Sequence, residues 1–320
     1  MPSSIARINL PIVLIAALLG FSGCNRPGGA TSNSSPPAND SQVTSESDAT
    51  NLHQRLKTLC DGSLGEIGVA VMQVESGQMV AVAGGEKLPL YSVFKLPLAI
   101  AVLKGVEENR ISLDKKIRVT PEDVAPGSQF NTDLWREPVE KTVSELLELS
   151  IVRSDNTSSD KLMELAGGPG AVTERMRAFG FSNIDIVNTV RGFTDHRENP
   201  NTGTAEDLAL LLARLQRGDL LQQAQVSLLL GFMERARTGG ERRLRANLPA
   251  DTQVADKTGS GDDATNDVGL ITLPGNQGHL AIAVLISGSK LSIDKQEKLI
   301  AEVARTAYDA YVSKATSATH

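Results

Sequence analysis

The chain has 320 residues, of which 40% are hydrophobic and only 3% are aromatic. This length is sufficient for one large domain or two small ones, with a core built mainly from Leu, Val, Ile and Ala. The formal net charge is −6 and the pI is near 5.4. Because a nucleic-acid-binding protein needs a basic face, and no long run of Lys and Arg occurs, the composition argues against a nucleic-acid partner.

Residues 1–24 are typical of a bacterial signal peptide. Arg7 precedes an apolar run from Leu10 to Leu19 that is too short to span a bilayer as a mature helix. Phe21-Ser22-Gly23-Cys24 then resembles a lipoprotein box, in which the cysteine becomes the lipid-modified first residue, although Leu is usual at position 21. We therefore expect export to the periplasm and a lipid anchor at Cys24, with plain cleavage and secretion as the alternative.

Residues 25–50 are rich in Ser, Pro, Asn, Thr and Gly and carry almost no large apolar side chain. Such a segment cannot offset the entropy of ordering, so we predict a disordered linker over 25–50 and a folded domain over 51–320. The second cysteine is Cys60. With Cys24 lipidated, Cys60 has no partner for an internal disulfide, and we expect it to be a small buried hydrophobe in the first helix.

Strand patterns lie near both ends of the domain, and helical patterns lie between them. A short helix over about 51–61 leads into strands over 66–74 and 78–83, joined by a hairpin turn at 75–77. An apolar, buried helix is predicted from Ser92 to about Glu108. The segment from about 114 to 225 is predicted to be largely helical, and strands return afterwards. The expected helices are 143–152, 157–165, 171–179, 205–216 (with Thr204 as N-cap), 222–236 and 293–312, and the later strands are 253–257, 267–273 and 280–287.

Ser92-Val93-Phe94-Lys95 places a hydroxyl and an amine three residues apart at the start of a predicted helix. This spacing puts both side chains on one helix face, within hydrogen-bonding reach. A serine hydroxyl is a poor nucleophile until a base removes its proton. Lys95 can be that base if burial and a second cation, for which Lys257 is the candidate, lower its pKa. A Ser-x-x-Lys pattern alone is weak evidence, because it occurs by chance about once in such a chain.

Ser154-Asp155-Asn156 lies between two predicted helices. Ser, Asp and Asn all favour helix N-caps, so a purely structural role is one interpretation. The functional interpretation gives Ser154 a hydroxyl that shuttles a proton and Asn156 an amide that binds a peptide-like substrate.

Lys257-Thr258-Gly259 closes a predicted strand and is followed by Ser260. A turn at the strand end is one interpretation. In the other, Lys257 adds positive field, Thr258 bonds a substrate carboxylate, and Gly259 permits close approach of the backbone. The N–H groups of Ser92 and Ser260 would then form an oxyanion hole.

All three motifs, in this order, resemble those of the penicillin-recognising serine enzymes and specifically the class A β-lactamase family. The resemblance covers roughly residues 52–312 and includes three further segments: Gly167-Gly168-Pro169, Leu248-Pro249-Ala250-Asp251 and Thr265-Asn266-Asp267-Val268. It implies an α/β fold of the β-lactamase/transpeptidase type. In that fold a five-stranded antiparallel sheet is flanked by helices and joined to an all-α subdomain, and the active site lies between them.

The resemblance also implies a role for each polar residue of the motifs. Ser92 is the nucleophile, Lys95 and Ser154 transfer protons, and the substrate contacts are Asn156, Lys257, Thr258 and Arg243. Arg243 falls where some family members place the arginine that binds the substrate carboxylate, and Arg245 is expected in a structural ion pair. The implied reaction opens a β-lactam ring through an acyl-Ser92 intermediate, which is then hydrolysed.

One element of the family pattern is missing. A class A β-lactamase carries on its Ω-loop a glutamate that activates the deacylating water. Counted from Gly180, it should fall at or near Val190, where residues 188–193 contain no carboxylate. Glu198 would reach the site only if the loop were rerouted, and an exposed loop carboxylate is the other interpretation. The short, glutamate-free loop resembles that of the cyanobacterial penicillin-binding protein A group, which are D,D-peptidases on the same fold.

Three functions therefore stay open: a class A-type β-lactamase, a D-Ala-D-Ala carboxypeptidase or transpeptidase acting on peptidoglycan stem peptides, and a penicillin-binding lipoprotein without turnover. The four histidines are dispersed, and His196 with Glu198 lacks further ligands at metal spacing. We expect no metal and no cofactor. We expect a monomer whose partner is a small-molecule β-lactam or a stem peptide.

Overall fold

The structure, a computed structural model, describes residues 40–128, 133–195 and 198–317. The predicted signal peptide over 1–24, the lipidation candidate Cys24, and His196 lie outside the described residues. From Ser41 onward the chain forms one compact unit. Within the described ranges, no helix combines the length and apolar character needed to cross a membrane.

The first helix, α1, is longer than predicted and corrects the linker boundary. It runs over Asp40–Cys60, so the last eleven residues of the predicted linker are helical. No Pro or Gly occurs within α1, whereas Pro37 lies just upstream. Leu52, Leu56 and Cys60 recur at helical spacing and are buried, as predicted for Cys60. This buried stripe anchors the helix. Once the helix has formed there, it can extend toward the N-terminus, because each further residue adds one backbone hydrogen bond.

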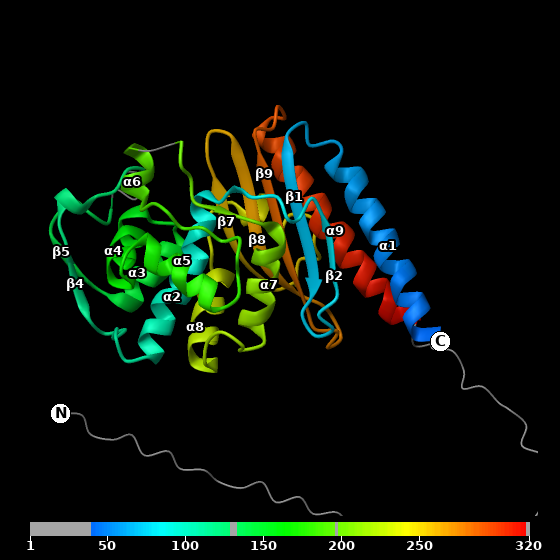
Figure 1. The fold of residues 1–320 in the computed structure, drawn as a ribbon, viewed down its shortest axis with the longest axis horizontal. Helices are drawn as coiled ribbons and strands as arrows, with labels where there is room; N and C mark the ends of the chain where they lie inside the picture. Colours follow the sequence, from blue (N-terminus) through cyan, green and yellow to red (C-terminus); the bar gives the residue numbers. More distant parts are fainter. Residues whose placement is uncertain (1–39, 129–132, 196–197, 318–320) are drawn as a thin grey trace, which may run out of the picture. The chain divides into compact units, whose positions relative to one another are not determined.

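A five-stranded antiparallel sheet forms the centre of the fold, as the sequence predicts. Its order is β2-β1-β9-β8-β7, so strands from the two ends of the domain lie side by side (Figure 1). In the β1–β9 pairing, Val69 lies opposite Val284. The strands are β1 (Glu66–Gln73), β2 (Met79–Val82), β7 (Val254–Ser260), β8 (Ala264–Thr272) and β9 (His279–Ser287).

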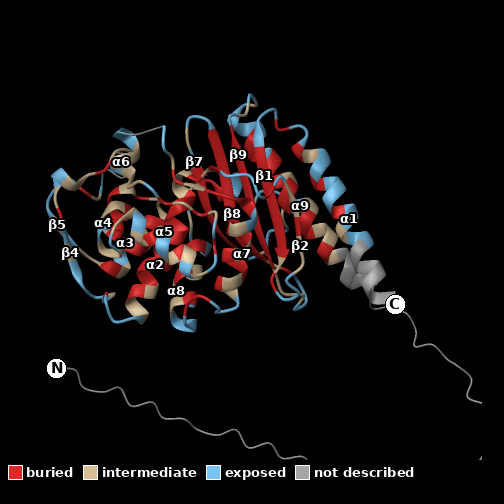
Figure 2. Cartoon of the chain, viewed as in Figure 1, coloured by how far each residue is buried: buried red, intermediate tan, exposed pale blue. Residues whose placement is uncertain are grey.

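Both faces of the sheet are buried, as the red strands in Figure 2 show. Successive side chains of a strand point to opposite faces. Val69 and Val71 of β1 belong to the core cluster that contains α1 and the closing helix α9 (Ile293–Ser317). Ala70 and Met72 belong to the second cluster, which includes α7 (Ala205–Gln216) and the helical subdomain. The sheet is therefore the middle layer between two helical layers.

The helical subdomain surrounds α2, which is apolar on most faces and almost wholly buried, as predicted. A short 3-10 turn, η1 (Tyr91–Phe94), leads into α2 (Lys95–Glu107). Thr204 is the N-cap of α7, since its side chain accepts a hydrogen bond from Asp207 N–H. The other helices are α3 (Val143–Val152), α4 (Asn156–Ala166), α5 (Pro169–Ala178), α6 (Val190–Asp195) and α8 (Gln223–Glu234).

The prediction of a largely helical segment from 114 to 225 needs one correction. β4 (Lys116–Val119) and β5 (Val139–Thr142) form an antiparallel hairpin at the edge of the subdomain (Figure 1). Each strand is only four residues long, too short for its alternating pattern to be read from the sequence. Two minor strands, β3 (Leu88–Pro89) and β6 (Thr202–Gly203), pair with each other. β3 comes just before η1 in the chain.

Candidate active site

Ser92 lies in η1, directly before α2, and lines a pocket. Its Oγ is 3.2 Å from Lys95 Nζ, so the predicted side-chain pair is in hydrogen-bonding contact. Asn266 of β8 donates from its side-chain amide to the carbonyl oxygens of Pro89 and Leu90, at 2.8 and 3.2 Å. These bonds fasten the turn that carries Ser92 to the sheet.

Lys95 is fully buried, and its amine is surrounded by acceptors. Nζ is 2.6 Å from Ser154 O and 2.7 Å from Asn156 Oδ1. A neutral amine has two N–H donors and one lone pair, so these two short contacts use both donors and leave the lone pair for a hydroxyl. Burial first, and then the charge of Lys257, hold the pKa of Lys95 well below its usual value. Lys95 therefore has the environment that the sequence analysis required of a base.

Ser154 lies at the junction of α3 and α4 in a left-handed conformation, with φ of 53°. The next residue, Asp155, is the N-cap of α4 and accepts a hydrogen bond from Ser158 N–H at 2.7 Å. Ser154 Oγ is 3.1 Å from Lys95 Nζ and also 3.1 Å from Lys257 Nζ. The motif thus caps the helix through Asp155, as one interpretation predicts, and it also places the Ser154 hydroxyl in contact with both amines. A non-glycine residue at positive φ is backbone strain of the kind that concentrates at functional sites.

Lys257 lies on β7 and is fully buried. Its Nζ donates to Ser154 Oγ and, at 2.9 Å, to Thr258 O. Burial lowers the pKa of Lys257 to about 8; Asp256 and Asp267 oppose this shift and Arg243 adds to it. At neutral pH Lys257 is therefore mainly cationic, and its positive charge adds to burial in lowering the pKa of Lys95.

Gly259 lets β7 approach η1 closely, as predicted. A Cβ at this position would lie 2.5 Å from Leu90 O and 3.2 Å from Val93 N. No side chain can be accommodated at such a distance. Ser260, the next residue, consequently lines the same pocket as Ser92.

The structure corrects the predicted direct contact between Arg243 and substrate. The Arg243 side chain is buried behind Ser260 and does not line the pocket. Its guanidinium donates to Ser260 Oγ at 2.8 Å, to Gly259 O at 3.2 Å and to the buried carboxylate of Glu297 at 3.2 Å. The ion pair with Glu297 of α9 holds Arg243 in place. Arg243 is connected to the pocket through its hydrogen bond to Ser260, which lines it. Arg245 forms the expected structural ion pair, with Asp256.

Thr258 is also turned away from the pocket. Its Oγ1 lies 2.9 Å from Thr238 O and 2.6 Å from Thr238 Oγ1, and its side chain is buried. A hydroxyl rotates freely about its C–O bond. Contact between Thr258 and a substrate carboxylate would therefore require the hydroxyl to leave Thr238.

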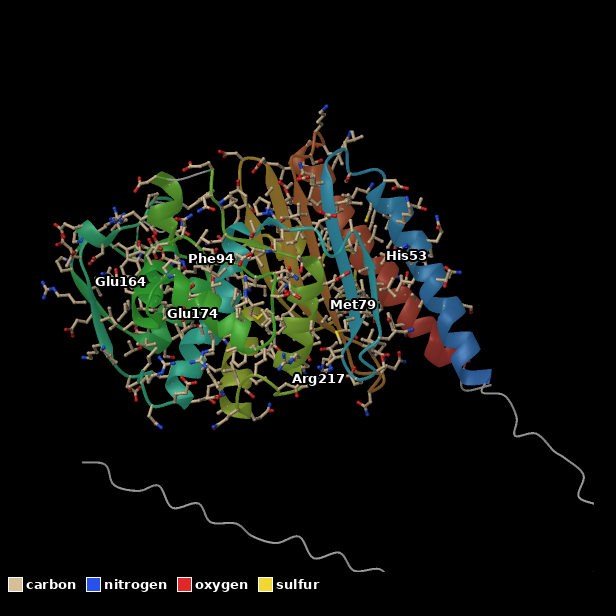
Figure 3. All side chains as sticks on the ribbon, viewed as in Figure 1. His53, Met79, Phe94, Glu164, Glu174 and Arg217 are labelled. Carbon is tan, nitrogen blue, oxygen red and sulfur yellow. The ribbon has the colours of Figure 1, made fainter. Side chains whose placement is uncertain are left out.

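The pocket lies where the helical subdomain meets the sheet and has a volume of about 250 Å³. Phe94, labelled at this junction in Figure 3, is one of its lining residues. Asn156 lines it as well, with Oδ1 accepting from Lys95 and Nδ2 donating to Pro126 O at 2.7 Å. An amide nitrogen has two hydrogens. The second hydrogen of Asn156 is therefore left for an acceptor in the pocket.

The Ω-loop region carries the helix α6, which the sequence analysis treated as loop. Asp160 Oδ1 accepts from Val190 N–H at 2.7 Å, and Oδ2 accepts from Arg191 N–H at 3.1 Å. Val190 lines the pocket at the position predicted for the family glutamate. The sequence analysis missed Asp160, although it stands four residues after Asn156 and thus on the same face of α4.

Glu198 lies outside the site, which contradicts its predicted catalytic role. It is exposed and does not line the pocket. The two hydrogen bonds that Asp160 accepts from the amides of Val190 and Arg191 hold α6 beside the pocket, and Glu198 comes after the end of α6 at Asp195. Within the described ranges, no group of three or more His, Cys, Asp or Glu side chains could hold a metal ion.

A comparison with known protein families matches residues 51–311 to the Beta-lactamase enzyme family. The chain belongs to this family. Among related sequences, Beta-lactamase VEB-1 of Pseudomonas aeruginosa is 29% identical over 289 residues, which are 85% of this chain and 94% of that protein. Extended-spectrum β-lactamase PER-1 of the same organism is 31% identical over 277 residues, which are 82% of this chain and 88% of that protein.

Solved structures agree with this assignment. The TLA-3 extended-spectrum β-lactamase has a TM-score of 0.77 at 32% identity, covering 82% of this chain and 99% of the other. A class A β-lactamase from Bacteroides cellulosilyticus has a TM-score of 0.77 at 27% identity, with 83% and 99% covered. The family and its fold thus group this chain with the class A β-lactamases, which are serine hydrolases.

Proposed function

We propose that this family member opens the β-lactam ring of its substrate by acyl transfer to Ser92 and then hydrolyses the acyl-enzyme. The observation that carries the proposal is the contact of Ser92 Oγ with a buried lysine amine whose two shortest contacts, Ser154 O and Asn156 Oδ1, are both to acceptors. The named relatives VEB-1 and PER-1 support the β-lactam as substrate class.

Acylation follows from the contacts around Ser154. Lys95 takes the proton of Ser92 as the hydroxyl attacks the lactam carbonyl. Ser154, between Lys95 and Lys257, passes a proton to the leaving nitrogen. The N–H groups of Ser92 and Ser260 stabilise the oxyanion, and the free N–H of Asn156 holds an amide carbonyl of the substrate. Lys257 and, through Ser260, Arg243 supply positive field for the substrate carboxylate.

Fewer side chains are available to activate the water that deacylates Ser92. No carboxylate is found among the described residues that line the pocket, and Val190 stands at the family's glutamate position. Lys95, once it has passed on its proton, is the base in contact with Ser92. We therefore expect acylation to be faster than deacylation.

Intact-mass measurement after mixing with benzylpenicillin, alongside steady-state hydrolysis of a chromogenic cephalosporin, tests the proposal. We expect a mass increase equal to one benzylpenicillin, which then disappears as the drug is hydrolysed. Ser92→Ala should remove both signals, since it removes the nucleophile. Hydrolysis that survives in Ser92→Ala would overturn the mechanism.

A D,D-peptidase is the second candidate, and the carboxylate-free pocket is the observation that favours it. A long-lived penicilloyl adduct is compatible with a peptidase. The acyl-enzyme that a peptidase must hydrolyse in its own reaction is a peptidyl ester, not a penicilloyl ester. The same mass experiment separates the two candidates. A persistent adduct, with release of D-Ala from a stem peptide ending in D-Ala-D-Ala, would identify the peptidase.

We also propose that the chain is exported, anchored to a membrane through Cys24 and monomeric. The sequence of residues 1–24 supports export and the anchor. Labelling cells with a radioactive fatty acid should mark the wild-type protein and leave Cys24→Ser unlabelled. Labelling of both proteins, or of neither, would contradict lipidation at Cys24.

A further inference from the structure

One wall of the pocket is apolar and aromatic. Tyr91 of η1 and Phe193 of α6 line it together with Phe94 and Val190. The Tyr91 and Phe193 rings meet edge to face, with centroids 5.8 Å apart and planes at 86°. This is a favoured geometry for aromatic pairs.

Tyr91 is held in place by groups outside the pocket. Its hydroxyl lies 2.6 Å from Asp263 Oδ1, in the turn between β7 and β8. A Cβ on Gly261 would lie 2.0 Å from Tyr91 Cε1, so the ring packs directly on the glycine backbone. The ring therefore occupies a fixed position before substrate arrives, which reduces the entropy lost on binding.

The pocket offers no charged partner. None of the described residues that line it carries a charged side chain. The amines of Lys95 and Lys257 lie buried and donate to protein acceptors. Arg191, the cation of α6, donates to the backbone carbonyls of Glu122 and Val124. A charged group against the aromatic wall would thus lose water without gaining an ion pair.

The size of the pocket also fits an aromatic group. An apolar cavity of about 150 Å³ is large enough to bind benzene. The volume here, about 250 Å³, leaves room for one ring and the atoms that link it to the reacting amide.

We propose that Tyr91 and Phe193 form a subsite for an uncharged aryl side chain of the acyl donor, and that this subsite selects against a carboxylate at the same position. The inference rests on the proposed acylation of Ser92 and adds the substrate class. It makes Phe193 a specificity-determining residue, since its ring is contributed by the Ω-loop helix and contacts the side chain rather than the reacting bond.

Three penicillins with one common nucleus test the subsite: benzylpenicillin, its α-carboxybenzyl analogue, and 6-acetamidopenicillanic acid, which keeps the side-chain amide but lacks the aryl group. The quantity measured is the second-order rate constant for acylation of Ser92, followed by intact mass. In the wild type we expect benzylpenicillin to react at least tenfold faster than either of the others, the usual range for an apolar group in a fitted pocket.

Phe193→Ala should reduce the ratio of the benzylpenicillin rate to the 6-acetamidopenicillanic acid rate about tenfold, and Phe193→Leu should reduce it less. Phe179→Leu is the matched control, because Phe179 is also partly buried but lies outside the pocket. It should leave the ratio unchanged. An unchanged ratio in Phe193→Ala, or equal rates of the three compounds with the wild type, would overturn the subsite while acylation itself persists. No acylation by any of the three would overturn the proposed function and the subsite together.

Discussion

Lys95 and Lys257 contact the same hydroxyl, that of Ser154, yet their proposed roles require opposite protonation states. Lys95 must be neutral to accept a proton, whereas Lys257 must be charged to keep it so. Burial lowers the pKa of both. For Lys95 the charge of Lys257 adds to this shift while Asp155 and Asp160 oppose it, whereas for Lys257 the opposing carboxylates are Asp256 and Asp267. Two lysines at one serine thus become a base and a fixed charge through their surroundings alone.

This division predicts a bell-shaped pH profile for acylation. The rate constant should fall as pH rises above about 8, where Lys257 loses its proton. It should also fall at low pH, where Lys95 becomes protonated. Rates of benzylpenicillin acylation, measured by intact mass across the pH range, check both limbs. Lys257→Arg stays charged through this range and should remove the alkaline limb; a limb that stays in place assigns it to another group.

At the scale of elements, α6 is a six-residue helix held at its start by a single side chain. Asp160 accepts from the first two amides of α6 and is half-buried beneath them. Burial raises the pKa of Asp160, although the two N–H donors oppose that shift. A helix this short is not stable by itself. The position of Val190 and Phe193 at the pocket therefore depends on α4.

Asp160→Ala should loosen α6 and lower the free energy of unfolding by about 1–3 kcal/mol, since the first two N–H groups of α6 lose a charged acceptor. Asp160→Asn, which keeps one oxygen acceptor, should have a smaller effect. Hydrogen exchange of residues 190–195 is the measurement, and the two variants should exchange there faster than the wild type. Asp207→Asn is the control, because Asp207 bonds Asn183 N–H instead. Unchanged protection of α6 in Asp160→Ala would show that α6 is held by other contacts.

At the scale of the whole molecule, the sheet is closed by strands from both ends of the domain. β1 pairs with β9, and α1 contributes Leu52 and Leu56 to the same core cluster as α9. Of the four residues 47–50, all but Ala49 are exposed, and Ala49 packs at the edge of this cluster. The contribution of α1 to stability should therefore come from its second half.

A chain beginning at Asn51 should have a free energy of unfolding within about 1 kcal/mol of the chain beginning at Asp40, because surface segments contribute little. Leu56→Ala should lower it by about 2–5 kcal/mol, the usual effect of a cavity in a core. Urea denaturation of the three proteins provides the comparison. A truncated chain as unstable as Leu56→Ala would mean that the first half of α1 also packs against the domain.

Much of the site was predictable because its motifs are local. The spacing of Ser92 and Lys95 on one helix start decides their contact, and Gly259 marks a close backbone approach that only glycine allows. The sheet was predictable from apolar, β-rich runs near both ends of the domain. The length of α1 and the β4–β5 hairpin were not, because a polar segment and two four-residue strands carry too little periodic signal.

The sequence by itself determined the family and the motifs from which Ser92 and Lys95 are predicted as nucleophile and base. Only the tertiary structure decided that Arg243 acts through Ser260, that Glu198 stays outside the pocket, and that Phe193 forms part of its wall. The physical reason is distance along the chain. The partners of these residues lie in other elements, such as Glu297 on α9 and Asp160 on α4, and folding alone brings them together.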